Sequence, residues 1–447
     1  MYRAERDPSL DVFMGATVPG NAVYPMMRDD LKRRLRELGV VKGVRNLQTS
    51  DAQSGKPIED LVSGRFHTTS RGQCFVAEAR YPPDYAHGDL TLSAFLDLSP
   101  RAVARVEQDE RVAEVDLRKV CFLDTETTGL SGGTGTMAFI VGLGYFVEDG
   151  FRLEQYFLRD PGDEPAMVEA LMESFPEFEA LVSFNGRCFD VPIIENRFIL
   201  ARVVPPLRDK VHVDLLHPAR RLWRYALSSC ALTSLEREVL GVRREQADVP
   251  SGIIPLLYRD YLRTGDARDM QRVLYHNQVD ILSMVTLAAR LCRAYVDPWR
   301  EGGWQGQRAL SGAEYYALGR WYEDSGLRAD AERAYRSALQ LSPKQGSTLR
   351  TRALRELAYL LKRSERRAEA SVLWQQLAAE DRDGIDGVLA HVELAKYLEW
   401  YTGDLLRAAK WTAEAIERVA AWGPGMRRQD ELADLRHRLS RLKRKLA

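Results

Sequence analysis

The stretch "VCFLDTETTGLSGGTGTMAFIVGLGYF", Val120 to Phe146, places two acids directly after an apolar run that is typical of a buried strand. Side chains two residues apart on a strand point to the same face, so we expect the carboxylates of Asp124 and Glu126 to meet at one spot. Two neighbouring anions repel, and the pKa of one would rise unless a cation neutralised both. A divalent ion that prefers oxygen ligands, Mg²⁺ or Mn²⁺, would do so.

The D-x-E pattern is a weak signal by itself, because it recurs at Asp330 and Glu332 inside a helical pattern with no strand before it. We interpret that second pair as solvated surface. The turn-forming residues "TTGLSGG" after Glu126 distinguish the first pair. The structural alternative for Asp124 is an aspartate that begins a turn or caps a helix.

Two further acids stand in comparable positions. In "LVSFNGRCFDVPIIENRF", another apolar run ends in a turn, and Asp190 opens the next helix, where an acid can also act simply as a cap. In "VLYHNQVDILSMVTL", His276 and Asp280 are four residues apart and share one helix face. A buried hydrogen bond between these two is the alternative, because an unpaired acid in an apolar stretch is costly.

The segments "FLDTETTGL", "FNGRCFDVP" and "YHNQVDILSM" occur in an order and at spacings that resemble the three exonuclease motifs of the DEDD group of ribonuclease H-like proteins. The resemblance is closer to the bacterial YprB family, some members of which carry tetratricopeptide repeats, and it covers residues 60 to 295. It implies an α/β ribonuclease H-like domain, a mixed sheet flanked by helices, followed by an all-α repeat domain. It also implies a metal-dependent 3′–5′ exonuclease that acts on the ends of single-stranded DNA or RNA.

The resemblance further implies that two divalent cations, Mg²⁺ or Mn²⁺, are held by four carboxylates: Asp124, Glu126, Asp190 and Asp280. His276 would orient or deprotonate the attacking water. The third motif departs from the usual forms of the group, because His276 and Tyr275 occupy each other's expected places. We prefer His276, since it shares the helix face of Asp280.

A second group of residues is expected to contact the substrate. The resemblance implies that the turn after the first strand receives the 3′-terminal nucleotide and that the loop of the second motif contacts the sugar–phosphate. A simple turn, and an asparagine that only shapes a turn, are the alternatives. Arg187 is the best single candidate for a phosphate contact. The expected substrate residues are Thr127, Thr128, Gly129, Leu130, Asn185 and Arg187.

Three regions of the chain differ in pattern. Residues 1–115 combine a basic helix, "RDDLKRRLRELG", with a strand, "QCFVAEARYPP". Residues 116–297 begin with three strands and then alternate helices and strands, which predicts the nuclease-like domain. Residues 305–447 are predicted to be helical throughout, and a protein partner is expected to bind there.

The repeat prediction depends on spacing. "YYALGRWYEDSGLRADAERAYRSALQLSP" has the residue offsets of a tetratricopeptide repeat, and "LRELAYLLKRSERRAEASVLWQQL" follows them more loosely. A third unit near "HVELAKYLEWYTGDLLRAAKWTAEAI" is out of register by about one residue. The basic C-terminal segment carries leucines three and four apart and is predicted to cap the repeats. A coiled coil or a nucleic-acid-binding arm is the alternative.

The amino-acid composition limits both the ligands that the protein can bind and the compartment in which we expect it. The sequence has 64 basic and 64 acidic residues, so any nucleic acid must bind a local patch. The five cysteines are scattered, no apolar run is long enough for a membrane span, and the N-terminus has no signal-peptide pattern. We therefore predict a cytoplasmic protein that makes no membrane contact. The alternative function is a catalytically weak or inactive nucleic-acid-binding scaffold that recruits partners through its repeats. A repeat-based adaptor is a third reading.

Overall fold

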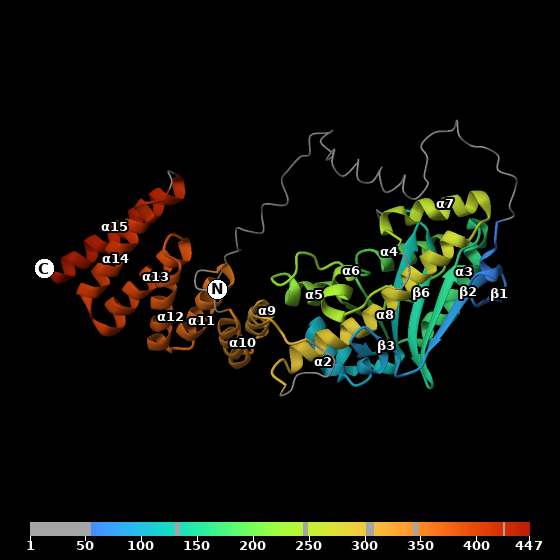
Figure 1. Cartoon of the computed structure of the whole chain (residues 1–447), viewed down its shortest axis with the longest axis horizontal. Helices are drawn as coiled ribbons and strands as arrows, with labels where there is room; N and C mark the ends of the chain where they lie inside the picture. The colour runs from blue at the N-terminus through green and yellow to red at the C-terminus, as the bar shows by residue number, and fades with distance from the viewer. Residues whose placement is uncertain (1–54, 130–134, 245–248, 301–307, 343–346, 423–424) are drawn as a thin grey trace. The chain divides into compact units, whose positions relative to one another are not determined.

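The fold is built around a seven-stranded mixed sheet with the order β1-β2-β7-β6-β5-β8-β9 (Figure 1). The computed structural model describes residues 55–129, 135–244, 249–300, 308–342, 347–422 and 425–447. Neighbours from β1 to β5 are antiparallel, whereas β8 and β9 run parallel to β5. The strands are β1 (Gly64–Thr69), β2 (Gly72–Tyr81), β5 (Val120–Thr127), β6 (Ala138–Val147), β7 (Gly150–Phe157), β8 (Ala180–Ser183) and β9 (Val211–Asp214).

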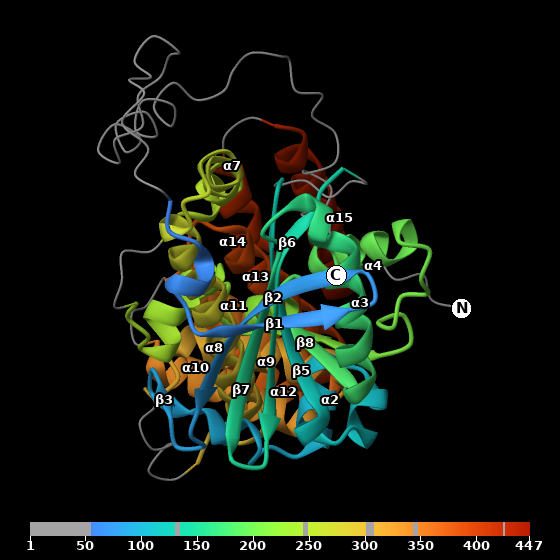
Figure 2. The same cartoon turned by 90° about the vertical axis from the view of Figure 1, so that its right-hand side faces the viewer.

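Helices cover both faces of this sheet. α3 packs on β1 and β2 and α8 packs on β5 and β6, with the strands between the two helices (Figure 2). β5 sends Phe122 into one core cluster and Leu123 into the other, which explains why its sequence is almost continuously apolar. The helices here are α2 (Pro100–Glu107), α3 (Glu164–Ser174), α4 (Asp190–Leu200), α5 (Leu216–Trp223), α6 (Leu232–Leu235), α7 (Ile254–Thr264) and α8 (Arg268–Val296).

The sheet begins earlier in the chain than the alternating pattern indicates. β2 pairs with β7 over seven residue pairs, so the sheet extends across the expected boundary at residue 116. A two-stranded ribbon, β3 (Ala86–His87) and β4 (Leu90–Thr91), follows β2. The basic helix expected at residues 28–39 lies outside the described residues.

Two glycines of β6 allow α8 to approach the sheet closely. A Cβ atom at Gly142 would lie 2.3 Å from Oδ1 of Asn277, and one at Gly144 would lie 2.5 Å from Cγ2 of Ile281. No larger residue fits at either place without moving the helix. The "VGLG" sequence therefore brings the polar face of α8 to the end of β5, where the first two acids lie.

The chain then continues as paired helices, which confirms the predicted all-helical C-terminal region. Neighbouring helices pack directly, and in the first pair a Cβ at Gly319 would lie 2.5 Å from the ring of Tyr335. The pairs are α9 (Gly312–Asp324) with α10 (Arg328–Leu341), α11 (Thr348–Arg363) with α12 (Arg367–Glu380), and α13 (Ile385–Tyr397) with α14 (Leu405–Ala420).

The one-residue offset of the third pair has a structural cause. Small residues that face the partner helix are twelve positions apart in the first two pairs, but Ala395 and Ala408 are thirteen apart. The extra residue is absorbed by a π-helical turn, Leu398–Thr402, at the end of α13. Ala408 is still fully buried, so the turn restores the packing register.

The last helix, α15 (Met426–Leu446), packs along α14. Leu432 and Leu435 join a buried cluster with residues of α14, and Leu442 joins a second cluster with Ala408. These three leucines of α15 are thus buried against neighbouring helices, which is the packing expected of a capping helix. No helix in the described part of the chain combines the length and apolar character needed to cross a bilayer.

Candidate active site

A pocket opens where β5 ends, and all four predicted carboxylates line it. Asp124 and Glu126 come from β5, Asp190 is the first residue of α4, and Asp280 lies on α8. His276, one turn before Asp280, lines the same pocket. Three elements far apart in the chain therefore bring five of the predicted site residues together.

Asp124 is held in place by a residue that the sequence analysis did not single out. Nδ2 of the fully buried Asn277 donates to Oδ2 of Asp124 at 2.7 Å. Oδ1 of Asn277 in turn accepts from Nε2 of Gln155 at 2.7 Å. Burial raises the pKa of Asp124 well above its usual range, and the charges of Asp280, Asp190 and Glu126 raise it further. The pocket thus concentrates negative charge that its own hydrogen bonds do not offset.

Asp190 is anchored from the opposite face of β5. The hydroxyl of Thr125 donates to Oδ1 of Asp190 at 2.5 Å, and only 4% of Asp190 is exposed. Burial raises the pKa of Asp190 to about 6, although the hydroxyl opposes the shift. The carboxylate of Asp190 also lines the pocket with the other three acids. A residue that only capped the helix would not need this position.

His276 is held in one tautomer by Arg244. Nη1 of Arg244 lies 2.9 Å from Nδ1 of His276, and a guanidinium can only donate. Nδ1 is therefore the acceptor, and the neutral ring carries its proton on Nε2. That nitrogen faces the acids, 3.5 Å from Oδ2 of Asp280 and 4.0 Å from Oε1 of Glu126. In this arrangement His276 can orient a water molecule or a phosphate oxygen, but it cannot accept a proton.

Arg244 also connects the pocket to a buried polar chain behind it. Its Nη2 donates to Oδ1 of Asp280 at 2.5 Å, and its Nε and Nη2 bind the two carboxylate oxygens of Glu236 at 2.9 Å each. Oε1 of Glu236 accepts from Ser283 at 2.8 Å, and the Ser283 hydroxyl lies 2.8 Å from Nε2 of His87. Asp280 is thus fixed by a network that begins outside the three motifs.

The donor set suits hard divalent cations, because four carboxylates line one pocket and the charges of three of them raise the pKa of Asp124. Within the described residues, however, no three His, Cys, Asp or Glu side chains are spaced as ligands of a single metal ion. The reason lies in the present partners: Asn277 holds Asp124 and Arg244 holds Asp280. Arg244 holds only Oδ1 of Asp280, so an ion bound by all four acids would have to use Oδ2 of Asp280 or displace the guanidinium.

The predicted substrate residues divide into two sets. Thr127 and Asn185 line the pocket, whereas Thr128 and Gly129 shape the adjoining turn. Asn185 has a φ of 68°, in the left-handed region that asparagine tolerates, so it shapes its turn as well. Leu130 lies outside the described residues.

Two residues of the motifs point elsewhere. Nη2 of Arg187 pairs with Oε1 of Glu107 at 2.7 Å and also donates to the carbonyl of His212, and Arg187 does not line the pocket. This placement does not support a phosphate contact by Arg187. Tyr275 lines a different pocket, beside Gln155 and Gln271, which leaves His276 as the motif residue beside the acids.

Asp214 is a further residue that the sequence analysis missed. It is fully buried, and its carboxylate accepts from the backbone amides of Asn185 at 2.8 Å, Arg187 at 3.2 Å and Leu216 at 3.1 Å. It therefore holds the loop that presents Asp190. The available signal was an acid at the end of the strand "KVHVDLL", the same kind of position that Asp124 occupies.

Residues 121–292 match the family model described as RNase_H superfamily, and the mixed sheet with helices on both faces is consistent with a ribonuclease H-like domain. Proteins with this domain are typically nucleic-acid hydrolases that use divalent metal ions. The chain is also similar to the uncharacterized protein YprB of Bacillus subtilis (strain 168). The two are 28% identical over 377 residues, which cover 83% of this chain and 86% of that protein.

Proposed function

We propose that this protein is a divalent-metal-dependent 3′–5′ exonuclease that hydrolyses phosphodiester bonds at single-stranded DNA or RNA ends. The observation that carries the proposal is the convergence of Asp124, Glu126, Asp190 and Asp280 on one pocket, with His276 beside them. The order of the three motifs supports the DEDD type, and the ribonuclease H superfamily domain supports a nucleic-acid hydrolase.

The four carboxylates would hold two ions, Mg²⁺ or Mn²⁺, which supply an activated water and stabilise the departing 3′ oxygen. The protein's own groups do the rest. His276 donates from Nε2 and positions the attacking oxygen, while Arg244 keeps the ring in that tautomer. Thr127 and Asn185, which line the pocket wall, would contact the terminal nucleotide. Asn277 and Thr125 keep Asp124 and Asp190 aimed at the same point.

The test measures label release from a 3′-labelled single strand of DNA and of RNA by the full chain with Mn²⁺. We expect mononucleotide release that a chelator stops and that Asp124→Asn reduces by about a thousandfold or more, as loss of a group that binds the transition-state cations should. Titration calorimetry with Mn²⁺ provides a readout apart from activity, and Asp124→Asn should weaken this binding.

Asp330→Asn is the matched control. Asp330 belongs to the same D-x-E pattern but lies on α10, outside the pocket, so its replacement should change neither release nor Mn²⁺ binding. Equal activity of the Asp124→Asn variant would reject the proposed site. No release on either polymer, together with Mn²⁺ binding that does not depend on Asp124, would reject the enzyme.

One observation favours a second candidate, a catalytically weak or inactive nucleic-acid-binding scaffold. Arg244 already pairs with Oδ1 of Asp280, and this positive charge weakens the attraction of the site for a metal ion. A scaffold predicts strand binding that survives in a chelator, with no turnover in Mn²⁺. The release experiment therefore separates the two candidates.

A further inference from the structure

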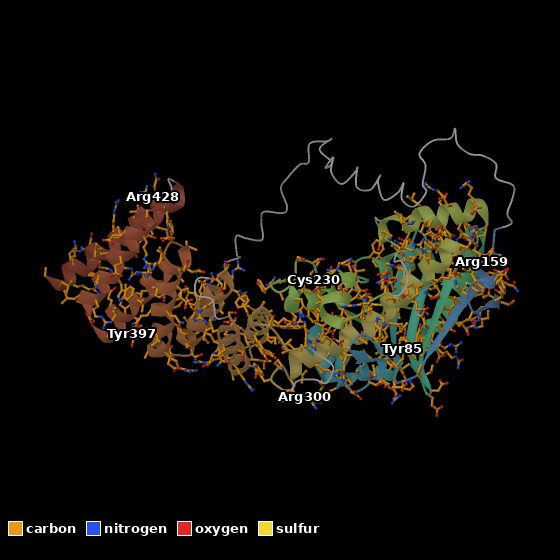
Figure 3. All side chains as sticks on the ribbon, viewed as in Figure 1. Tyr85, Arg159, Cys230, Arg300, Tyr397 and Arg428 are labelled. Atoms are coloured by element: carbon orange, nitrogen blue, oxygen red, sulfur yellow. The ribbon has the colours of Figure 1, made fainter. Side chains whose placement is uncertain are left out.

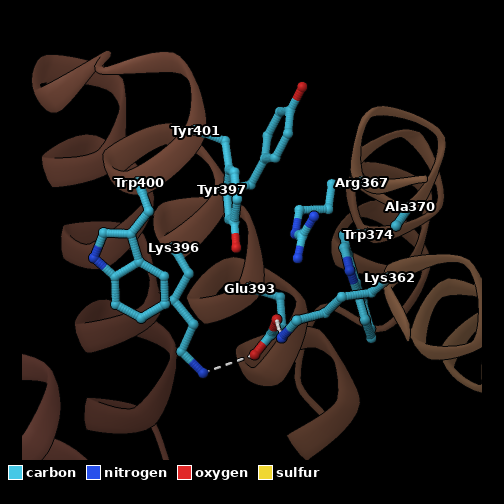
Figure 4. A pocket seen from close by; sticks show the side chains of 9 residues that line it. All are labelled: Lys362, Arg367, Ala370, Trp374, Glu393, Lys396, Tyr397, Trp400 and Tyr401. Atoms are coloured by element: carbon cyan, nitrogen blue, oxygen red, sulfur yellow. Dashed lines mark hydrogen bonds and ion pairs between the residues drawn. The ribbon is translucent and has the colours of Figure 1, made fainter. Parts of the chain in front are cut away.

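A pocket that is not part of the candidate active site lies between the second and third helical pairs (Figure 4). Its lining comes from α11, α12, α13 and the π-helical turn that follows α13. Four aromatic rings and three cations dominate its lining, with a single acid, Glu393, among them. The lining residues are Lys362, Arg367, Ala370, Trp374, Glu393, Lys396, Tyr397, Trp400 and Tyr401.

Two of the rings are unusually exposed. Trp400 is 54% and Tyr401 55% exposed, more than any other aromatic side chain in the described part of the chain. Both lie in the π-helical turn Leu398–Thr402, and such one-turn π-helices are frequent at functional sites. At the corresponding turn the first two pairs carry "EDSG" and "KRSE" where the third carries "EWYTG". The extra residue thus places apolar rings where the other pairs place polar groups.

Cations stand beside these rings. The guanidinium of Arg367 lies 4.4 Å from the ring centre of Tyr401, and that of Arg438, on α15, lies 5.9 Å from the ring of Trp400. Tyr397, labelled in Figures 3 and 4, is nearly parallel to Tyr401, with ring centres 6.2 Å apart. One stacked pair of rings and the exposed ring of Trp400 thus stand beside positive charges.

The pocket carries more positive than negative charge. Lys362 and Lys396 both bind the carboxylate of Glu393, so one acid is shared by two ammonium groups. Arg367 pairs with Glu365, which is largely exposed, and its Nε is buried without a hydrogen-bond acceptor among the described residues. An anionic ligand would supply the missing acceptors.

We propose that this pocket binds a single-stranded nucleic acid, with bases stacked on Trp400 and Tyr401 and phosphates beside Arg367 and the two lysines. A nucleotide offers a flat ring and an anion at the spacing of one residue, which the alternation of rings and cations matches. An extended acidic peptide fits less well, because the lining contains no Asn, Gln, Ser or Thr side chain that could pair with a peptide backbone. Binding here does not depend on hydrolysis at the candidate active site.

The test uses the full chain in a chelator, so that no strand is cut. Fluorescence anisotropy measures binding of a labelled single strand of about fifteen nucleotides, thymidines in one arm and uridines in the other. Replacing both rings, Trp400→Ala with Tyr401→Ala, should weaken binding by about tenfold or more, since each stacked base contributes substantially. Leu406→Ala is the matched control: Leu406 is 73% exposed on α14 but does not line the pocket, and its variant should bind normally.

Arg367→Gln gives a second, milder variant that keeps the proposal testable if the double replacement disturbs folding, which thermal unfolding would reveal. It should weaken binding and reduce the slope of log affinity against log salt by about 0.7, the value for one phosphate contact on a single strand. Unchanged strand binding in both pocket variants overturns the proposal. So does a polyglutamate peptide that competes for the strand and loses its own affinity in both variants, because the site would then be a peptide site.

The binding test of this pocket can succeed or fail independently of the release test of the proposed function. Strand binding that requires Trp400 and Tyr401 stands even if Mn²⁺ produces no label release. Conversely, release that depends on Asp124 stands even if the pocket variants bind strands normally. If both hold, the pocket variants should lose activity mainly through a higher KM on long strands.

Discussion

Arg244 governs two properties of the candidate site at the scale of single residues. It assigns the proton of His276 to Nε2. It also forms ion pairs with two carboxylates, those of Asp280 and Glu236. Its side chain is only 8% exposed, so these contacts form at low dielectric, where an unpaired charge is expensive. Arg244 therefore stabilises the fold and competes with any cation for Asp280.

The stability of the Arg244–Glu236 pair can be measured directly. Arg244→Gln should lower the free energy of unfolding by about 3–5 kcal/mol, because it leaves Glu236 buried without a counter-charge. Urea unfolding of this variant, of Glu236→Gln and of the double variant gives a double-mutant cycle. We expect the double variant to be more stable than Arg244→Gln alone, and additive effects would show that the pair is not coupled.

His87 gives the protein an acid-sensitive stability. Burial, and next the nearby Arg244, lower the pKa of His87 to about 4, below the usual value of about 6.5. The unfolded chain therefore takes up a proton first, and this contribution to stability is lost as pH falls from about 6.5 towards 4. Between pH 7.5 and pH 5 the loss should be about 2 kcal/mol.

Urea unfolding at the two pH values tests this expectation, with His87→Gln compared with the unchanged chain. The variant should lose correspondingly less stability on acidification. His217→Gln serves as a control because His217 is exposed. The same acid sensitivity in the His87→Gln variant would contradict the assignment.

At the scale of elements, the contact between β6 and α8 positions the acids. Gly142 lies opposite Asp124 in the sheet, and its missing side chain leaves room for Asn277. The same close approach lets Asn277 reach Asp124, and it places His276 and Asp280 at the pocket. A shift of this helix would therefore change both the core and the site.

Gly142→Ala should cost about 1–3 kcal/mol of unfolding free energy, as overpacking does in a dense core, and should weaken Mn²⁺ binding by moving α8. Gly252→Ala is the matched control, since a Cβ there meets no atom within 4 Å. Thermal unfolding and Mn²⁺ calorimetry measure the two effects. Equal stability of the two variants would show that α8 is not held by this contact.

At the scale of the whole molecule, the helical pairs cover apolar surface of the α/β part. The buried Nε1 of Trp223 donates to Oε1 of Glu314 at 2.7 Å, and the ring of Tyr295 lies 4.6 Å from that of Trp321. Glu314 is itself fully buried and paired with Arg308. These contacts cross the expected boundary between residues 297 and 305.

A chain that ends after residue 297 should therefore be less stable than the full chain and should bind a dye specific for exposed apolar surface. The cause is the loss of the cover over Trp223 and Tyr295, both buried in the full chain. A chain that ends after residue 420 lacks α15 but keeps the cover over Trp223 and Tyr295, so as the control it should bind less dye than the 297-residue chain. A 297-residue fragment that melts like the full chain and binds no dye would show that the boundary separates independent domains.

Much of the fold could be predicted because its signals are local. A strand has a side-chain period of two residues, which explains why Phe122 and Leu123 enter different cores. A helix has a period of about 3.6 residues, which explains the spacing that pairs Gly319 with Tyr335. Resemblance to known motifs supplied the acids, since Asp124, Asp190 and Asp280 stand at recognisable positions. Arg244, Asn277 and Asp214 could not be found in this way, because their contacts with Asp280, Asp124 and the loop before Asp190 join residues 27 to 153 positions apart.

The sequence by itself determined the strands, the helices and the five motif residues that now line one pocket, because these follow from side-chain periodicity and from short motifs. Only the tertiary structure decided what those residues contact: a guanidinium on Asp280, an amide on Asp124, and Arg187 turned towards Glu107 instead of the pocket. The physical reason is that the protonation and charge of a buried group depend on which atoms lie within about 4 Å of it, and folding alone brings those atoms together.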